Sequence, residues 1–342
     1  MPNGDVVLEA SNLTKTFHIG RAGFGRTRVS AVDDVSLTLR RGESLGIVGE
    51  SGCGKTTLAR MLVGLERPDS GHIDLAGRDV DGMRGRARRS LSRDIQMVFQ
   101  DPYTSLNPRL TVFDLVSEPL TVHRLQTTRT ARRDRVAELL MLVNLSPDMM
   151  GRFPHQFSGG QRQRIGIARA IALEPKVLVC DEPVSALDVS VQAQVINLLR
   201  SLQHRLGIGL VFIAHDLGVV RHVSDRTAVM YLGRLAESSD TSELFTMPSH
   251  PYTQALLSAS PHVDRRRGRR MGQRIILVGD PPSPTEPPSG CRFHTRCPLA
   301  TKVCSEQEPA LAEVAPGHTA ACHHSDQARG DLSTALPLPA RS

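Results

Sequence analysis

One segment constrains the fold of this chain more than any other: Gly-Glu-Ser-Gly-Cys-Gly-Lys-Thr at residues 49–56. It matches the pattern G-x-x-x-x-G-K-[ST], in which glycines let backbone N–H groups converge on phosphate oxygens. An apolar run at residues 44–48 precedes it, and a helical pattern covers residues 55–65. A strand, a glycine-rich loop and a helix N-terminus in that order predict a phosphate-binding site.

The first 250 residues alternate between short apolar runs and helical patterns. Further runs of strand length lie at residues 95–99, 177–180 and 210–214, and a helical pattern covers residues 161–173. This alternation predicts an α/β domain with a mostly parallel sheet and some antiparallel strands. We expect residues 6–10 and 32–39 to form an antiparallel pair joined by a mobile loop at residues 20–28.

The composition predicts three parts. Residues 1–250 are expected to form the nucleotide-binding domain, with a helical subdomain at about residues 101–172. A small C-terminal extension is expected at residues 251–324, because residues 279–290 are rich in Pro, Gly and Ser and four cysteines follow. Residues 325–342 have little to bury and are predicted to be a disordered tail.

Charged and hydroxyl side chains complete the predicted phosphate site. Lys55 supplies a positive charge to the β- and γ-phosphates, and Thr56 offers a hydroxyl to Mg²⁺. The apolar run at residues 177–180 ends in Asp181 and Glu182. Alone these acids could be solvated, but with Lys55 upstream we interpret Asp181 as a Mg²⁺ ligand acting through water and Glu182 as the group that polarises the attacking water. The residues predicted to bind nucleotide here are Gly49, Glu50, Ser51, Gly52, Cys53, Gly54, Lys55, Thr56 and Thr57.

A second anion-binding segment decides the class of protein. Phe157-Ser-Gly-Gly-Gln161 leads directly into a helical pattern with basic residues, which again forms a phosphate-binding helix N-terminus. One nucleotide needs only one phosphate loop. The pentapeptide resembles the ABC-family signature LSGGQ, with Phe157 in place of Leu. In that family the signature of one subunit closes over the γ-phosphate held by another, which implies such contacts for Ser158, Gly159, Gly160 and Gln161.

Other motifs of that family follow in its order, across about residues 5–250. Phe17 lies where an aromatic ring stacks on adenine, although it could also be a core residue. Gln100 corresponds to the Q-loop glutamine that senses Mg²⁺, and Asp188 ends the D-loop Ser185-Ala-Leu-Asp188. His215 corresponds to the switch histidine that contacts the γ-phosphate. The resemblance implies an ATPase that uses ATP and Mg²⁺, with Lys55, Gln100, Glu182 and His215 as catalytic residues.

Three stretches narrow the resemblance to the ATPases of dipeptide and oligopeptide importers: residues 96–109, 153–164 and 279–298. The Gly/Arg loop at residues 20–28 is similar to the second, F-type ATPase of the pair. The resemblance implies two permease subunits, a second ATP-binding subunit in a heterodimer and an extracytoplasmic solute-binding protein. Other small solutes, such as nickel complexes or glutathione, are alternative cargoes, since no residue of an ATPase subunit contacts the cargo.

Composition bears on the location and on a second class of function. No segment approaches the roughly 20 apolar residues of a membrane-spanning helix, and the N-terminus lacks the features of a signal peptide. Together with these features, the resemblance implies a peripheral protein on the cytoplasmic face of a bacterial membrane, docked on its permease. The net charge of +7 is the only support for an ABC ATPase acting on nucleic acid, and the absence of Trp argues against base stacking.

The cysteines suggest a further site. Cys291, Cys297, Cys304 and Cys322 gather in the last fifth of the chain. Four thiolates suit a [4Fe–4S] cluster or Zn²⁺, and the resemblance to the peptide-importer extension favours the cluster. His294, His318, His323 and His324 are close enough in sequence to substitute as zinc ligands, and four unligated thiols are the remaining alternative. The distance in sequence from the nucleotide motifs predicts a structural or regulatory role.

Overall fold

The computed structural model describes residues 5–20, 27–80, 83, 85–101, 105–259, 275, 277 and 279–329. Its strands are β1 (Val6–Ile19), β2 (Thr27–Arg40), β3 (Ser44–Val48), β4 (Ser70–Leu75), β5 (Ile95–Val98), β6 (Val177–Asp181), β7 (Gly209–Ala214), β8 (Arg226–Tyr231), β9 (Arg234–Asp240), β10 (Ala312–Ala315) and β11 (His318–Ala320). Its α-helices are α1 (Lys55–Leu62), α2 (Arg86–Asp94), α4 (Val112–Val122), α5 (Arg129–Leu142), α6 (Gly159–Ile171), α7 (Val189–Leu206), α8 (Leu217–Val223), α9 (Thr241–Thr246), α10 (Pro251–Ala259), α11 (Lys302–Glu306) and α12 (Ser325–Ala328). Short 3-10 helices occur at η1 (Pro147–Gly151), η2 (Pro154–Gln156) and η3 (His294–Arg296).

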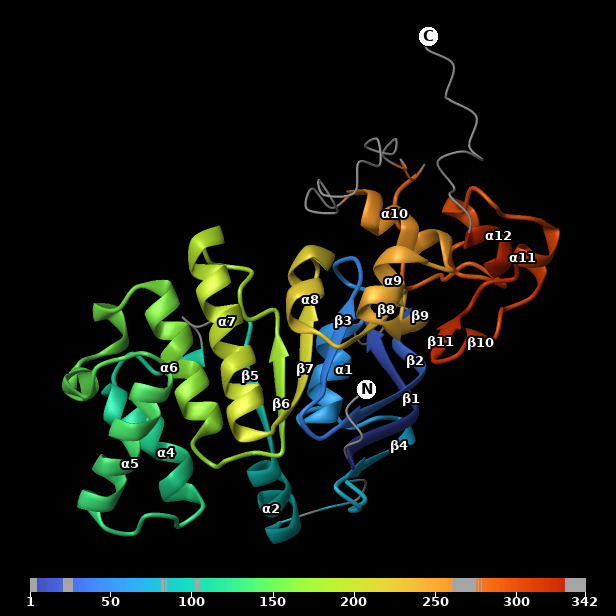
Figure 1. The fold of residues 1–342 in the computed structure, drawn as a ribbon. Coiled ribbons are helices and arrows are strands. Elements are labelled where there is room, and N and C mark those ends of the chain that lie inside the picture. The colour runs from blue at the N-terminus through green and yellow to red at the C-terminus, as the bar shows by residue number, and fades with distance from the viewer. Residues whose placement is uncertain are drawn as a thin grey trace.

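A mixed sheet forms the centre of the molecule (Figure 1). Its strand order is β10-β11-β9-β8-β3-β7-β6-β5. The five strands from β8 to β5 pair in parallel, whereas β8, β9, β11 and β10 pair antiparallel. The predicted α/β class with a mostly parallel central sheet is therefore confirmed.

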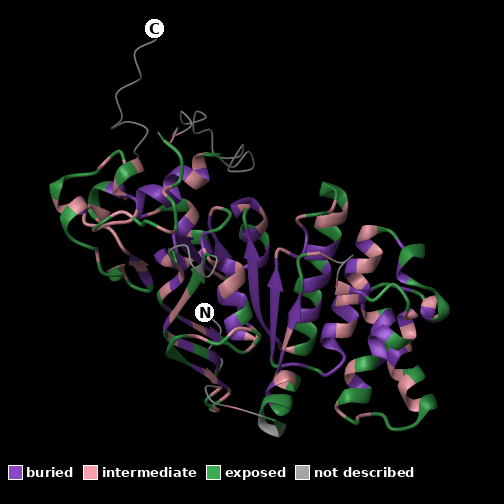
Figure 2. Cartoon of the chain, turned by 180° about the vertical axis from the view of Figure 1, so that it is seen from behind, coloured by how far each residue is buried: buried purple, intermediate pink, exposed green. Residues whose placement is uncertain are grey.

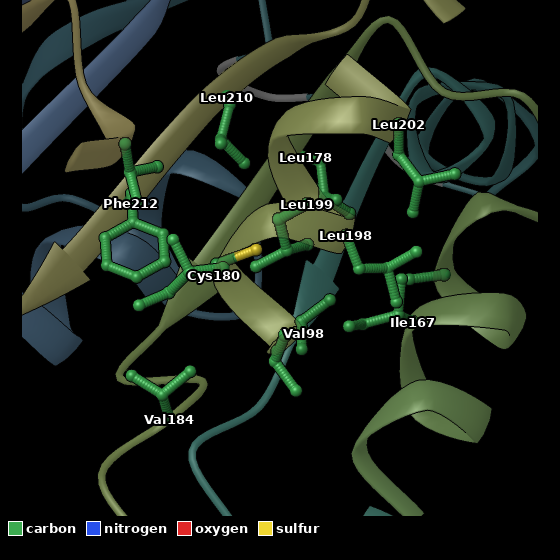
Figure 3. Packing of buried hydrophobic residues seen from close by; sticks show 14 of the residues in the cluster. Val98, Ile167, Leu178, Cys180, Val184, Leu198, Leu199, Leu202, Leu210 and Phe212 are labelled. Atoms are coloured by element: carbon green, nitrogen blue, oxygen red, sulfur yellow. The ribbon is translucent and has the colours of Figure 1, made fainter. Parts of the chain in front are cut away.

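The inner strands are apolar on both faces because helices cover both faces of the sheet. Along β6, Val177 and Val179 belong to one hydrophobic cluster, whereas Leu178 and Cys180 belong to the other. Figure 2 shows that the central strands are buried, and Figure 3 shows side chains of β6 and β7 against Leu199 of α7. Two cores thus hold the strands whose ends carry the motif residues.

A second sheet and a helical lobe flank this centre. The strands β2, β1 and β4 form an antiparallel sheet, which confirms the expected pair and extends it to 14 residues in each of β1 and β2. Most of the loop at residues 20–28 lies outside the described residues. The helices α4, α5 and α6 pack together in a lobe beside β5 and β6 (Figure 1). Among the described residues, no helix has the length and apolar character needed to cross a membrane.

The C-terminal extension is joined to the central sheet. Strand β11 pairs with β9 through Thr319↔Ser238 and Ala320↔Glu237. The buried carboxylate of Glu237 lies 2.7 Å from Nε2 of His318 and accepts the backbone N–H groups of Ser249 and His250. A buried carboxylate without such partners would cost several kcal/mol, so this network ties the extension to residues 1–250.

Ordered structure continues past residue 325, where the disordered tail was expected to begin. Residues Ser325–Ala328 form α12, and Ala328 is fully buried. The backbone oxygen of Ala328 accepts a hydrogen bond from the side chain of Gln254 in α10. The burial of Ala328 and this hydrogen bond explain the difference, since they hold the segment against α10. Residues 330–342 lie outside the described part of the chain.

An aromatic cluster forms the other anchor of the extension. Phe293 is 1% exposed, and its ring centroid lies 5.4 Å from those of Tyr231 and Tyr252. Tyr231 comes from β8 and Tyr252 from α10, so the Phe293 side chain fills a space between the central sheet and the first helix of the extension.

We expect Phe293→Ala to detach the extension, because removing a buried aromatic ring costs about 3–5 kcal/mol. Limited proteolysis followed by mass spectrometry should show faster cleavage between residues 280 and 329. Leu311→Ala is the control, since Leu311 is 41% exposed, and it should leave the cleavage rate unchanged. Equal rates in both variants would show that Phe293 does not anchor the extension.

Candidate nucleotide-binding site

The phosphate loop, residues 49–56, is packed so closely against its neighbours that two of its positions have room only for glycine. A Cβ on Gly49 would collide with the backbone oxygen of Met230, and a Cβ on Gly54 with that of Ala31. Gly54 also has φ +105°, a conformation that other residues rarely adopt. The loop therefore packs tightly between β8 and β2 before α1 begins at Lys55.

Lys55 places a buried charge inside this loop. It is 4% exposed, and its Nζ donates to the backbone oxygens of Gly49 at 2.8 Å and Glu50 at 2.9 Å. Ser51 and Gly52 are exposed at the tip of the loop, and Cys53 is buried beneath it. The ammonium thus lies at a helix N-terminus, where an anion is favoured.

Thr56 and Asp181 meet at the end of β6. The hydroxyl of Thr56 donates to Oδ1 of Asp181 at 3.2 Å. Burial raises the pKa of Asp181, and the nearby Glu182 raises it further, whereas the Thr56 hydrogen bond opposes the shift. A hydroxyl beside a carboxylate is an all-oxygen donor set, which suits the hard cation Mg²⁺. These residues therefore fit the predicted metal ion. Thr57 follows in α1 and is half-buried.

Glu182 connects three of the predicted motifs. Its Oε2 accepts from Nε2 of Gln100 at 3.0 Å and lies 3.5 Å from Nδ1 of His215. Its backbone has φ +43°, which costs on the order of 1–3 kcal/mol for a residue other than glycine. The backbone N–H of Glu182 donates to Ile213, and its carbonyl accepts from Ser185. These bonds hold the carboxylate at the carboxyl ends of β5, β6 and β7.

The signature segment lies in another part of the chain. Ser158 caps α6, accepting the N–H of Gln161, whose side chain in turn accepts the N–H of Ser158. Gly159 and Gly160 form the first turn of α6. This helix belongs to the helical lobe, whereas α1 packs against the central sheet (Figure 1).

Two further predicted residues are exposed. The ring of Phe17 is 36% exposed and lies 5.5 Å from Nζ of Lys15, so Phe17 is not a core residue. Asp188 precedes α7 and is exposed. Both side chains are therefore accessible to a ligand or to another chain.

The four cysteines gather without forming a metal site. Burial raises the pKa of Cys297 to about 12 and of Cys322 to about 11, and the nearby thiols of Cys291 and Cys304 add to both shifts. Cys291 and Cys304 complete the group. In the described part of the chain, however, no three His, Cys, Asp or Glu side chains are placed to hold a metal ion. The structure thus gives the predicted [4Fe–4S] cluster, or Zn²⁺ in its place, no support.

The histidines considered as substitute ligands have other partners. His318 is fully buried between Glu237 and Glu243. His324 pairs with the hydroxyl of Thr301, His323 with the backbone oxygen of Gln307, and His294 with that of Cys291.

Two contacts to the phosphate loop were not predicted from the sequence. The hydroxyl of Tyr252 accepts the backbone N–H of Glu50 at 2.9 Å, and Arg296 pairs with the Glu50 carboxylate at 3.0 Å. Position 296 is 246 residues from position 50, and no local pattern relates them. The distance in sequence, from which a structural or regulatory role was predicted for the cysteine region, therefore does not correspond to a distance in the fold.

Comparison with known families agrees with this geometry. The family model described as "ABC transporter" matches residues 32–185. The model described as "Oligopeptide/dipeptide transporter, C-terminal region" matches residues 236–304, a span that runs from β9 into the cysteine region.

Individual relatives match nearly end to end. The chain is 52% identical to the oligopeptide transport ATP-binding protein AppF of Bacillus subtilis, over 94% of this chain and 98% of the relative. It is 49% identical to the oligopeptide transport ATP-binding protein OppF of Salmonella typhimurium, over 90% and 92%. A solved dimeric ATP-binding cassette, MJ0796 bound to ADP and Pi, matches with a TM-score of 0.61 at 29% identity, covering 68% of this chain and 98% of that one. The chain therefore belongs to the ABC transporter ATP-binding proteins, in the branch that carries the oligopeptide/dipeptide transporter C-terminal region.

Proposed function

We propose that this chain is the ATP-binding and ATP-hydrolysing subunit that powers ABC-type import of dipeptides or oligopeptides. The observation that carries the proposal is the convergence of Gln100 and His215 on Glu182, beside the buried Lys55. The identity of about 50% with oligopeptide transport ATP-binding proteins supports peptides as the cargo class. The likeness to a di/tripeptide transport ATP-binding protein of Pseudomonas aeruginosa, at 48% identity, supports the same class.

Each side chain of the site has a task in this proposal. Lys55 exchanges the carbonyls of its own loop for the β- and γ-phosphates of ATP. Thr56 and Asp181 would hold Mg²⁺, which would supply positive charge for phosphoryl transfer. Glu182 orients the attacking water, Gln100 and His215 position the Glu182 carboxylate, and His215 contacts the γ-phosphate. Phe17 stacks on adenine.

We further propose that the site is completed by a second, different ATPase subunit. Ser158 and the α6 N-terminus of one subunit cover the γ-phosphate bound by the other, and Asp188 lies at the crossing between them. The separation of α6 from α1 in this chain supports a two-chain site. The closing of the dimer is passed to two permease subunits through the segment after Gln100, on the cytoplasmic face of the membrane. An extracytoplasmic solute-binding protein delivers the cargo.

We expect Glu182→Gln to bind ATP and to hydrolyse it about 100-fold more slowly or worse, because the amide cannot polarise water. The measurement is peptide-stimulated phosphate release by the reconstituted transporter, with each ATPase subunit substituted separately so that a more active partner site cannot mask the loss. Glu174→Gln is the matched control, since the Glu174 side chain is 71% exposed. Turnover near wild type in every complex that carries Glu182→Gln would exclude Glu182 as the base.

The heterodimer has its own test. Affinity purification of the assembled permease should recover this chain together with a second ATPase of different sequence. The isolated chain should be mostly monomeric, or dimerise weakly with ATP, because half of each composite site is missing. Recovery of two copies of this chain with no other ATPase would overturn this part of the proposal.

The [4Fe–4S] cluster stays a prediction of the sequence. The grouping of the four thiols is compatible with it, but no metal-ligand group among the described residues supports it. Anaerobically purified protein would be brown and contain about four irons per chain if the cluster is present. Colourless protein with one zinc per chain would replace the cluster by Zn²⁺, and metal-free protein with titratable thiols would leave neither.

A further inference from the structure

The segment between the first two cysteines, residues 291–297, lies directly against the phosphate loop. Nη1 of Arg296 lies 3.0 Å and 3.2 Å from the two carboxylate oxygens of Glu50. The Arg296 side chain is 8% exposed and that of Glu50 27%. Most of this ion pair is therefore shielded from solvent. Shielded charges interact more strongly than charges on an open surface.

Glu50 is held at its backbone as well as at its carboxylate. Its N–H donates to the Tyr252 hydroxyl at 2.9 Å, and its carbonyl oxygen accepts from Nζ of Lys55 at 2.9 Å. The same carbonyl accepts the N–H of Cys53. A displacement of Glu50 would therefore move the carbonyl oxygen that accepts hydrogen bonds from both Lys55 and Cys53.

Arg296 is itself held by the aromatic cluster. Its Nη1 lies 3.4 Å from the hydroxyl of Tyr231, whose ring packs on Phe293 and Tyr252. Phe293 precedes Arg296 by three residues and is buried. The guanidinium is thus fixed by the same contacts that dock the extension, and its position depends on the fold of the cysteine segment.

The charge of Glu50 gives this contact a consequence for a phosphate ligand. Without a cation beside it, a carboxylate in the phosphate loop repels a polyanion. Arg296 supplies that cation from outside the nucleotide-binding domain. Resting on the proposed ATPase function, we propose that Arg296 is a positioning residue of the ATP site, which neutralises and fixes Glu50 and so makes nucleotide affinity depend on the folded state of the cysteine segment.

The four-thiol group lies beside Arg296 in the chain and bears on the folded state of the cysteine segment. Arg296 directly precedes Cys297, whose thiol belongs to the four-thiol group. Cys291, at the other end of the segment, is bound through its backbone N–H to the carbonyl oxygen of Cys304. Both ends of the segment that carries the guanidinium are therefore joined to residues of the thiol group.

The test measures binding of a fluorescent ATP analogue to the full-length chain. We expect Arg296→Met to weaken binding about three- to tenfold, the usual range for a partly shielded ion pair. Arg296→Lys should restore part of the affinity, because it returns the charge but not the guanidinium geometry. The double variant Glu50→Gln/Arg296→Met should bind within about twofold of the Glu50→Gln variant, because the carboxylate that needed a cation is gone.

Arg329→Met is the matched control. Arg329 also joins the C-terminal part of the chain to residues 1–250. It pairs with Glu243 of α9 at 3.3 Å and donates to the backbone oxygen of Val314, and neither partner lies in the phosphate loop. We expect wild-type affinity from this variant. Unchanged affinity in Arg296→Met, or a double variant as weak as Arg296→Met, would overturn the inference. Failure of the wild-type chain to bind the analogue would instead count against the proposed ATPase function.

Discussion

The site depends on one buried ammonium. Lys55 is 4% exposed, and an isolated charge so far from water would cost several kcal/mol. The phosphate loop offsets that cost by turning the carbonyls of Gly49 and Glu50 toward Nζ. A phosphate group offers the same ammonium a full negative charge. The loop carbonyls therefore partly compensate the buried charge, and a phosphate group would be a stronger partner for it.

The sheet register then decides which groups join Lys55. In parallel strands the carboxyl ends lie at one edge, and ligands bind there. Val48 pairs with Ala214, and Asp181 pairs with Ile213. The residues that follow β3, β6 and β7 consequently meet in space although long segments separate them. The unusual backbone of Glu182 turns its carboxylate toward Gln100 and His215 at this edge.

This geometry explains what the sequence could predict. A polar residue directly after a buried strand is a local pattern, so the strands near residues 44–48 and 177–180 and the meeting of Gln100, Glu182 and His215 could be expected from the chain alone. The pairing of β11 with β9 could not, because a three-residue strand carries almost no signal. His318 was considered as a metal ligand from its place among the cysteines. Its buried contacts with Glu237 and Glu243 depend on tertiary packing, which cannot be predicted from the spacing of residues in the sequence.

The contacts of the extension also show that the boundary at residue 250 does not separate two independent structural units. The phosphate loop receives a hydroxyl from α10, through Tyr252, and a guanidinium from the cysteine segment, through Arg296. Strand β11 lengthens the same sheet whose other end is β5, and Gln100 follows β5 shortly after it ends. A region that looks appended in the sequence is therefore part of the structure that positions Glu50. Glu50 accepts a hydrogen bond from Lys55 at its carbonyl oxygen and pairs with Arg296 at its carboxylate. Glu50 therefore links the C-terminal part of the chain to the buried ammonium.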